Sequence, residues 1–347
     1  MFAVVASIPS PSSGALTIGP LSIHAYGLMI ALGVIAATWL LGRRLEASGA
    51  GTREDASSVA VWSVIAGVIG ARLYHVVTDW DLFKDDLGRI PQIWRGGLGI
   101  PGGILFGALA SLWAFKRRGI PPAVGLSAGA PALALAQAIG RFGNWFNQEL
   151  FGKPTDLPWA LRIDAAHIPA GYAPGTTFHP TFLYESLWNF ALCIVLLRID
   201  KKFRLRPGRL FAMYVVGYSI GRFWVEGLRI DPAHLAGGLR LNQWVALVVG
   251  LLALLYLVVD WQRHRDDVAP ATIYDGDGDD DDDVEDTDDD LEAADLDEDP
   301  EALDEDPEAQ DEETATGEES EQDPDARPDE DEPEPEADRP DLRESLD

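Results

Sequence analysis

Seven apolar runs, each long enough to cross a lipid bilayer, occupy most of the first 265 residues. A membrane-spanning helix needs about 20 residues, because each residue adds about 1.5 Å and the hydrocarbon core is about 30 Å thick. The runs that approach this length are Ser22–Leu41, Ser57–Val77, Leu98–Phe115, Ile120–Gly140, Thr181–Leu197, Leu210–Leu228 and Leu241–Val259. The sequence therefore predicts an all-α integral membrane protein with seven transmembrane helices.

Clusters of Lys and Arg in alternate connections indicate how the predicted spans are oriented. They include Arg43 and Arg44, Lys116–Arg118, Lys201 and Lys202, and Arg263 and Arg265. All fall on one side of the membrane, which the positive-inside rule makes cytoplasmic. We therefore expect the N-terminus outside and the C-terminus in the cytoplasm. Because no Lys or Arg precedes its short apolar run, Met1–Gly14 is interpreted as an external segment rather than a cleaved signal peptide.

Residues 266–347 differ sharply in composition from the rest of the chain. They contain 42 acidic and three basic residues, a net charge of −39, whereas residues 1–265 contain 15 acidic and 24 basic residues, a net charge of +9. A segment so rich in charge cannot bury enough apolar surface to offset the loss of chain entropy on folding. We therefore expect a membrane domain in residues 1–265 and a disordered acidic cytoplasmic tail in residues 266–347.

Charged residues within the predicted spans gather in their outer halves. Arg222 lies about 20 Å from the cytoplasmic end of its span, and Glu226 lies one helical turn farther out. Arg141 lies at the outer end of the fourth span and Glu185 near that of the fifth. Arg72 lies near the outer end of the second span, and for this residue a purely structural role is the alternative. Because charges in hydrocarbon are costly, they usually serve a function. The pattern predicts a polar cavity in the outer half of the bundle.

The densest polar segment beside a span is Gly140–Gly152. Its glycines permit tight turns, through which Arg141, Asn144 and Glu149 could converge on a ligand. A guanidinium offers a planar set of donors that matches phosphate oxygens. The aromatic residues Trp145 and Phe146 also suit an interfacial anchor, so composition alone leaves both interpretations open.

This segment resembles the signature of the prolipoprotein diacylglyceryl transferase family, Gly-Arg-x-Gly-Asn-Phe-x-Asn-x-Glu-x-x-Gly. The matching residues are Gly140, Arg141, Gly143, Asn144, Asn147, Glu149 and Gly152, with Trp145 in place of Phe. Three further stretches resemble the family in the same order, namely Tyr26–Met29, His179–Glu185, and Tyr218–Glu226 with Arg229. The resemblance covers about residues 20 to 260 and leaves the acidic tail outside.

The resemblance implies a multi-pass enzyme of the bacterial cytoplasmic membrane. Members of the family transfer the diacylglyceryl group of phosphatidylglycerol to the thiol of a lipobox cysteine in a prolipoprotein. A thioether forms and glycerol phosphate is released, which is the first step of lipoprotein maturation. The implied partners are phosphatidylglycerol, lipobox-containing prolipoproteins and membrane lipids, without nucleic acid, cofactor or metal. The single cysteine, Cys193, excludes an internal disulfide and a CxxC metal site, and we expect a monomer.

The same resemblance implies which residues carry the reaction. The catalytic set is Arg141, Arg222, Glu226, Glu149, Tyr26 and Tyr218. The set that binds phosphatidylglycerol is Arg141, Asn144, Asn147, Gly152, Arg222, Arg229 and His179. We expect the two shared arginines to hold the phosphate, and Glu226 or Glu149 to orient them or to take the thiol proton. The two tyrosines would contact the headgroup or relay a proton. His179 is either a base or a polar residue that begins the fifth helix.

One departure from the family pattern affects the mechanism. Many members have a histidine before the glycine pair of the third span, whereas this chain has Pro101 before Gly102 and Gly103. The identity of the general base that ionises the thiol therefore stays open.

Two other functions also fit a membrane protein with buried charge. A transporter with an outward-facing polar cavity would place charges near the middle of the bilayer, but the sequence has no internal repeat of the kind that many transporters show. A membrane scaffold would act through the acidic tail, and removing residues 266–347 would then abolish its function, whereas an enzyme would keep its activity.

Overall fold

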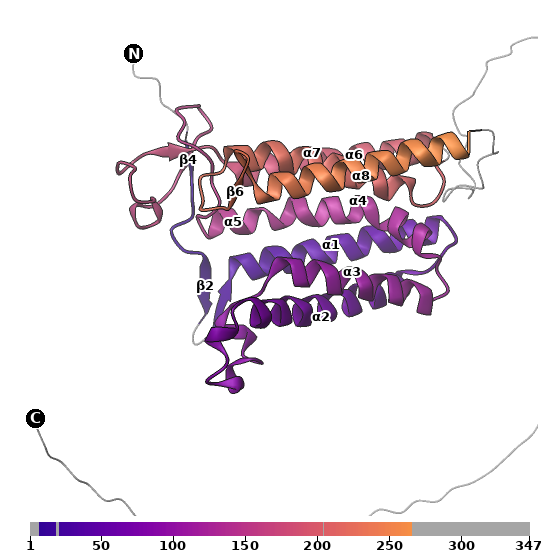
Figure 1. Ribbon diagram of the computed structural model, residues 1–347, viewed down its shortest axis with the longest axis horizontal. Helices are drawn as coiled ribbons and strands as arrows, with labels where there is room; N and C mark the ends of the chain where they lie inside the picture. The colour runs from indigo at the N-terminus through magenta and orange to yellow at the C-terminus, as the bar shows by residue number, and fades with distance from the viewer. Residues whose placement is uncertain (1–6, 19–20, 204, 266–347) are drawn as a thin grey trace, which may run out of the picture. The chain divides into compact units, whose positions relative to one another are not determined.

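Seven long helices run side by side in the part of the chain that the structure describes, which is residues 7–18, 21–203 and 205–265 of a computed structural model (Figure 1). They are α1 (Ala25–Ala47), α2 (Arg53–Thr78), α3 (Ile100–Arg117), α4 (Pro122–Gly140), α6 (Thr181–Lys202), α7 (Arg209–Leu228) and α8 (Leu241–Arg263). Each overlaps one of the seven predicted runs, so the helical class is confirmed. The predicted acidic tail, residues 266–347, lies outside the described residues.

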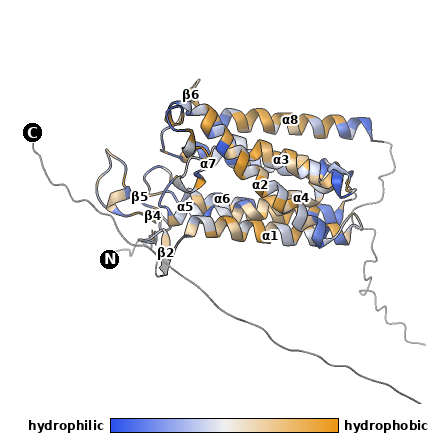
Figure 2. Cartoon of the chain, turned by 90° about the horizontal axis from the view of Figure 1, so that it is seen from below, coloured by the Kyte–Doolittle hydropathy of each residue, from blue (hydrophilic) through white to orange (hydrophobic). Residues whose placement is uncertain are grey.

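Five segments of the described chain are long and apolar enough to cross a membrane. They are α1, α2, α4 with the short helix α5 (Phe142–Phe146), α6 and α8. The mean hydropathy of α3 is lowered by Lys116 and Arg117 at its end, and that of α7 by Arg222 and Glu226 within it. Apolar residues cover the lengths of the helices and polar residues lie at their ends (Figure 2). The chain is therefore a multi-pass membrane protein.

Small residues allow the helices to pack closely. Helix α4 contacts α1, α6 and α7, and its buried face includes Ala128, Ala130 and Ala134. Helices α2 and α3 meet at Gly70 and Gly102, where a Cβ added to Gly102 would lie 2.2 Å from the carbonyl oxygen of Gly70. In a membrane, where lipid is as apolar as the helices, such close backbone approach favours association.

Short strands and turns lie at one end of the bundle, which we call the strand end. The strands are β1 (Ile8–Pro9), β2 (Ala15–Ile18), β3 (Leu21–His24), β4 (Leu161–Arg162), β5 (Thr177–Phe178), β6 (Leu235–Ala236) and β7 (Leu239–Arg240). In the sheet β1-β4-β5, the pair β1–β4 is parallel and β4–β5 antiparallel, while β2–β3 and β6–β7 are antiparallel hairpins. The single-turn helices are η1 (Trp80–Leu82), η2 (Leu87–Arg89), η3 (Ile93–Arg95) and η4 (Ala165–His167).

The predicted start of the first span was wrong. Residues Leu21–His24 pair with β2, and the helix begins at Ala25 rather than Ser22. Apolar and polar residues alternate along Leu21–His24, a period of two that is typical of a strand. The apolar content of this stretch therefore belongs to a hairpin that precedes the helix.

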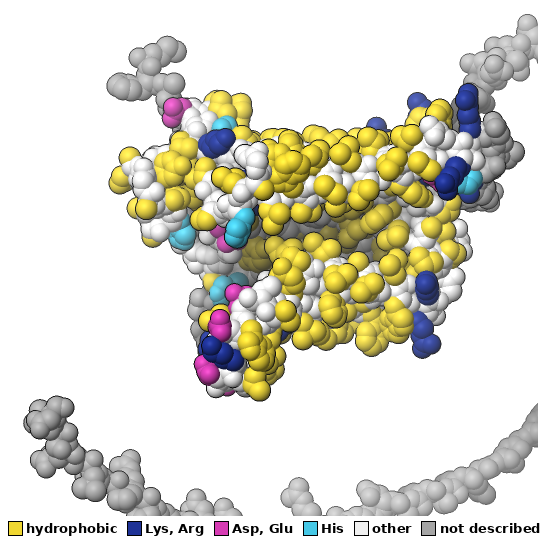
Figure 3. All heavy atoms as spheres, in the orientation of Figure 1, with side chains coloured by type: hydrophobic (Ala, Val, Ile, Leu, Met, Phe, Trp, Pro, Cys, Tyr) yellow, Lys and Arg dark blue, Asp and Glu magenta, His cyan; other side chains and the backbone are white. Residues whose placement is uncertain are grey.

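Buried charge also lies at the opposite end of the bundle, where Lys and Arg side chains gather around the end of α8 (Figure 3). Arg44 Nη2 lies 2.7 Å from Asp200 Oδ2, and both side chains are buried. Arg209 Nε lies 2.5 Å from Asp260 Oδ2. Here α1 and α6 continue past the predicted spans, so the helices carry paired charges at both ends and not only in their outer halves.

Candidate active site

Glu185 holds two of the predicted phosphate ligands together at the strand end. It lies in the second turn of α6, and its carboxylate is 7% exposed. Arg141 Nε, just after α4, lies 2.7 Å from Glu185 Oε2. Arg222 Nη1, in α7, lies 3.4 Å from Glu185 Oε1. The end of α4 and the helices α6 and α7 thus bring two guanidinium groups to opposite oxygens of one carboxylate.

Glu226 is fully buried and lies among three arginines. Its Oε2 lies 2.7 Å from Arg222 Nη2, one turn earlier in α7, and 3.5 Å from Arg229 Nη1. Its Oε1 lies 2.7 Å from Arg240 Nε. Cations therefore lie within 3.5 Å of both carboxylate oxygens, although Oε2 accepts no hydrogen bond of regular geometry from the described residues. This arrangement favours orientation of the arginines, one of the two roles expected for Glu226, over transfer of the thiol proton.

Asp231 extends the same network beyond the end of α7. It receives two bonds from Arg229, at 2.7 Å from Nε and 2.9 Å from Nη2, and lies 2.8 Å from Arg240 Nη2. Burial raises the pKa of Asp231, but the hydrogen bonds and charges of Arg229 and Arg240 outweigh it, so the pKa is lowered overall. The ion-pair network, as we call it below, thus joins Arg141, Glu185, Arg222, Glu226, Arg229, Asp231 and Arg240.

Two members of this network were missing from the sequence prediction. Asp231 and Arg240 lie in the connection between α7 and α8, a short stretch without periodicity or motif. The sequence identified Glu185 only as a charge within a span. Its position in the His179–Glu185 stretch, which resembles the family, was the signal that could have identified it as a site residue.

Glu149 binds amides rather than the arginines that we expected. Asn144 Nδ2 donates to Glu149 Oε1 at 2.9 Å, and Asn147 Nδ2 donates to the same oxygen at 3.3 Å. The backbone turns sharply here, since Gln148 and Leu150 have φ angles of 53° and 61°, a region that non-glycine residues rarely adopt. Asn144 and Glu149 are therefore in contact with each other, whereas Arg141 pairs with Glu185.

Two glycines of the signature, Gly143 and Gly152, lie where another side chain approaches so closely that a Cβ would not fit. A Cβ on Gly143 would lie 2.7 Å from Cδ2 of Tyr26, so this glycine admits the tyrosine ring against α5. A Cβ on Gly152 would lie 2.8 Å from Cβ of His179. Gly152 also pairs with Arg229 across an isolated bridge. These contacts explain both glycines by packing.

His179 lies just before α6 in a short chain of hydrogen bonds. Its Nδ1 lies 3.0 Å from the hydroxyl of Tyr184, and Trp159 Nε1 donates to that hydroxyl at 3.0 Å. Burial, and then the charge of Lys153, lower the pKa of His179. The direction of the bond between Nδ1 and the Tyr184 hydroxyl depends on the tautomer of the ring.

Tyr218 lies one turn before Arg222 on α7, and its ring stacks on that of Tyr214 with centroids 6.0 Å apart. Residues four apart share a helix face. Tyr218 therefore lies on the side of α7 that carries Arg222, one turn deeper in the bundle.

Pro101, at the start of α3, and Arg72, in α2, both have structural explanations. Pro101 lies in the first turn of α3, where the missing N–H costs nothing. Arg72 donates to the carbonyl oxygens of Arg89, Ile90 and Gly96 at 2.7 Å each, and to that of Gly97 at 2.9 Å. Arg72 therefore fixes the connection between α2 and α3, which is the structural alternative considered for it.

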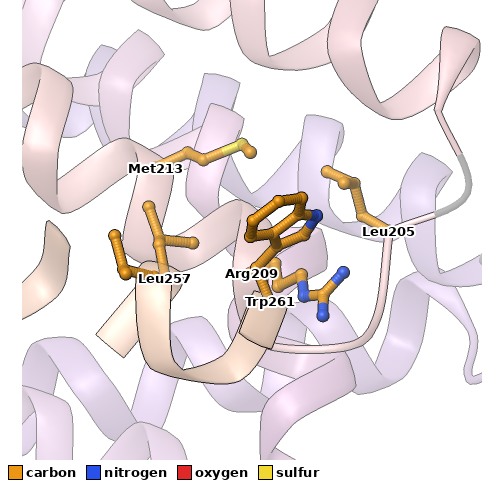
Figure 4. Close-up of a pocket in the computed structure, with 6 residues that line it drawn as sticks. Leu205, Arg209, Met213, Leu257 and Trp261 are labelled. Atoms are coloured by element: carbon orange, nitrogen blue, oxygen red, sulfur yellow. The ribbon is translucent and has the colours of Figure 1, made fainter. Parts of the chain in front are cut away.

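Two pockets elsewhere in the described residues are less suited to chemistry. One of about 310 Å³ lies between the ends of α7 and α8 and is lined mainly by apolar side chains, with Arg209 as its charged residue (Figure 4). That arginine is already paired with Asp260. The other, of about 550 Å³, lies between α1 and α2 and has Arg53, paired with Glu46, as its charged residue. The charged groups of the ion-pair network make it the stronger candidate site.

Comparison with known proteins identifies the family of the chain. Residues 13–259 match the family model for prolipoprotein diacylglyceryl transferase. The chain is 49% identical over 264 residues to phosphatidylglycerol–prolipoprotein diacylglyceryl transferase 1 of Streptomyces coelicolor, which covers 75% of this chain and 76% of the relative. It is 51% identical over 263 residues to the corresponding transferase of Cutibacterium acnes, with 74% and 88% covered. The chain belongs to the prolipoprotein diacylglyceryl transferase family.

Proposed function

We propose that this enzyme transfers the diacylglyceryl group of phosphatidylglycerol to the lipobox cysteine of prolipoproteins in a bacterial cytoplasmic membrane. The names of its relatives support both substrates. They give no support to the alternative of a transporter. The observation that carries the proposal is the pair Arg141 and Arg222 held on one buried carboxylate, Glu185.

The geometry of this pair suits a phosphate ligand. Arg141 uses Nε for Glu185, and among the described residues no partner is assigned to its two terminal nitrogens. A guanidinium whose outer edge is open can give two parallel hydrogen bonds to phosphate oxygens. We infer that Arg141 binds the phosphate through this edge and that Arg222 approaches it from α7.

The charge of the ion-pair network matches the same ligand. Four arginines and three carboxylates give the network a net charge of +1 when all are ionised. The phosphodiester of phosphatidylglycerol carries a single negative charge. Binding therefore neutralises the network, and this reduces the cost of burying charge near the membrane.

In the proposed reaction the cysteine thiolate attacks the lipid carbon that bears the phosphate ester. A carbon–sulfur bond forms as the carbon–oxygen bond breaks, and the electron pair of the broken bond goes to the phosphate oxygen. Glycerol phosphate leaves with one more negative charge than the diester had. Arg141 and Arg222 would stabilise this growing charge as preset donors, while the fixed lipid presents its carbon to sulfur in line.

The remaining site residues would act around this centre. Asn144 and Asn147 would hold Glu149 in place beside the lipid, and Tyr26 would line the site against α5. Tyr218 would contact the lipid below the phosphate. The acceptor of the thiol proton stays open, because Glu226 is occupied by arginines.

We further propose that all seven long helices span the membrane. The strand end would then face outward and the end of α8 the cytoplasm, with residues 266–347 as a cytoplasmic tail. The gathering of Lys and Arg at the end of α8 supports this orientation (Figure 3). We also propose a monomer, because α4, α6, α7 and α8 of one chain supply the ion-pair network.

The test is a transfer assay with the full-length purified protein, phosphatidylglycerol and a lipobox peptide. Mass spectrometry should detect a diacylglyceryl group on the peptide cysteine. Arg141→Ala should lower kcat/KM about 100-fold or more, as expected for loss of a preset donor. The matched control is Arg53→Ala, which removes an exposed arginine paired with Glu46 at the other end of the bundle. Near wild-type turnover in Arg141→Ala would exclude the phosphate assignment.

A further inference from the structure

Arg240 is a buried arginine whose nitrogens are all used within the protein. It precedes α8 and is 8% exposed. Its Nε lies 2.7 Å from Glu226 Oε1, its Nη2 lies 2.8 Å from Asp231 Oδ2, and its Nη1 donates to the carbonyl oxygen of Arg229 at 3.0 Å. An arginine engaged on every nitrogen is poorly placed to bind a substrate as well. Its effect on a reaction must pass through its partners.

The partner that links Arg240 to the site is Glu226. Arg240 holds Oε1 of this carboxylate, while Oε2 faces Arg222 Nη2 at 2.7 Å. Without Arg240, the remaining partner of Oε1 would be Asn242 Nδ2 at 3.3 Å. An amide at that distance replaces a charge-assisted bond poorly. A fully buried carboxylate would then turn toward its other cations, of which Arg222 at 2.7 Å lies nearer than Arg229 at 3.5 Å.

Such a shift would change the position of Arg222. This arginine contacts Glu226 at 2.7 Å and Glu185 at 3.4 Å. The longer contact is the weaker of the two, so Arg222 interacts with both carboxylates and more strongly with Glu226. A stronger pull from Glu226 would lengthen the contact with Glu185 and withdraw Arg222 from Arg141.

The second partner, Asp231, fixes the backbone around this contact. Arg229 binds both oxygens of Asp231, and Arg240 binds one of them from the other side. Together with the bond to the Arg229 carbonyl, these contacts hold the end of α7 against the start of α8. Arg240 therefore combines two roles, an electrostatic one on Glu226 and a structural one on Asp231.

We propose that Arg240 is a positioning residue for diacylglyceryl transfer, acting through Glu226 to set the place of Arg222 beside Arg141. The inference rests on the proposed function. In this role Arg240 does not touch the lipid or the peptide. It fixes the distance between two cations that stabilise the departing phosphate, so its loss lowers the rate of the chemical step more than the affinity for phosphatidylglycerol.

The test compares Arg240→Gln with Arg240→Lys in the full-length protein, using initial rates of transfer to a lipobox peptide and thermal unfolding in the same detergent. Because a displacement of about 1 Å can cost about 100-fold in rate, Arg240→Gln should lower kcat between about 10-fold and 100-fold. The KM for phosphatidylglycerol should change less than about threefold, because phosphate binding by Arg141 persists. Arg240→Lys keeps a cation beside Glu226 and should recover part of kcat.

A double-mutant cycle with Glu226→Gln separates positioning from stability. If Arg240 acts through Glu226, the effect of Arg240→Gln on kcat should nearly vanish when Glu226 is already Gln. If Arg240 acted only by holding Asp231, Arg240→Gln would lower kcat by the same factor whether residue 226 is Glu or Gln. That result would overturn the proposal. So would a kcat for Arg240→Gln within twofold of wild type, or a loss equal to the loss of folded protein.

Arg141→Ala in the same assay keeps the two proposals distinct. If Arg141→Ala abolishes transfer while Arg240→Gln keeps kcat within twofold of wild type, the proposed function stands and the role of Arg240 falls. If the wild-type protein transfers no diacylglyceryl group to the peptide, both fall.

Discussion

Replacing Glu185 with glutamine is the sharpest single perturbation of the site. The amide has nearly the shape of the carboxylate, so packing of α6 is kept, but one negative charge is removed from between Arg141 and Arg222. The amide can accept from one guanidinium, yet it presents its own N–H groups to the other. The contacts of 2.7 Å and 3.4 Å can then no longer both persist, and the two arginines should separate.

The size of the effect follows from these contacts. Loss of one preset donor costs about 100-fold to 1,000-fold in kcat, and a displacement of about 1 Å costs about 100-fold. We therefore expect kcat of Glu185→Gln to fall about 100-fold. The KM for phosphatidylglycerol should not rise, because the net charge of the ion-pair network increases from +1 to +2 and attracts the anionic headgroup more strongly.

The assay measures initial rates of lipobox peptide modification over a range of phosphatidylglycerol concentrations in detergent micelles. Glu46→Gln is the control, since Glu46 pairs with Arg53 in an exposed position at the opposite end of the bundle. A kcat for Glu185→Gln within threefold of wild type, in protein that unfolds at the wild-type temperature, would refute the idea that this carboxylate holds the arginines for catalysis.

Two further predictions concern packing and pH. Gly143→Ala should lower the free energy of unfolding by about 1–3 kcal/mol, because the new Cβ would lie 2.7 Å from the Tyr26 ring. The measurement is chemical unfolding, and the control is Gly140→Ala, whose new Cβ would meet nothing within 4 Å. Equal effects of the two substitutions would contradict the packing argument. Because burial and then Lys153 lower the pKa of His179, the unfolded chain binds a proton at higher pH than the folded protein. Its contribution to stability is therefore lost as the pH falls below about 6.5, the unfolded value, toward the lower folded pKa. His179→Gln should unfold at a temperature less sensitive to pH between about 7 and 5 than wild type, with His167→Gln as the control, and identical pH slopes would count against the assignment.

The helices could be predicted from sequence because length and hydropathy act over whole segments. The prediction was least accurate at the helix ends. At the first span a hairpin was included, since Leu21–His24 is apolar enough to extend a run although its alternation indicates a strand. At the other end of the bundle α1 continues to Ala47. Charged residues there end a hydrophobic run without ending the helix, because Arg44 finds Asp200 as a buried partner.

The site could be predicted in part for a related reason. Charges within apolar spans are conspicuous, and this identified Arg222, Glu226 and Glu185 before their contacts were seen. Arg240 and Asp231 lie in a short connection between helices, where charged residues are ordinary and nothing in the sequence distinguishes a buried arginine from an exposed one. For Glu149, the resemblance implied a role in orienting the arginines or in taking the thiol proton. The turn through Gln148 and Leu150 instead brings it to Asn144.

The order of contacts within the network supports Arg141 as the proposed place for an anion. The charges alternate from Arg141 through Glu185 and Arg222 to Glu226, and then through Arg229 and Arg240 to Asp231. Every interior cation touches two carboxylates, whereas Arg141 touches one, and it is also the most exposed of the four arginines, at 21%. The pair Arg229 and Arg240 between Glu226 and Asp231 gives the network its excess positive charge, and Arg141 is its most accessible cation. In the proposed complex the phosphate of the lipid would give Arg141 a second anionic partner, so the remote pairs at Asp231 and Arg240 would help to define a site that they do not touch.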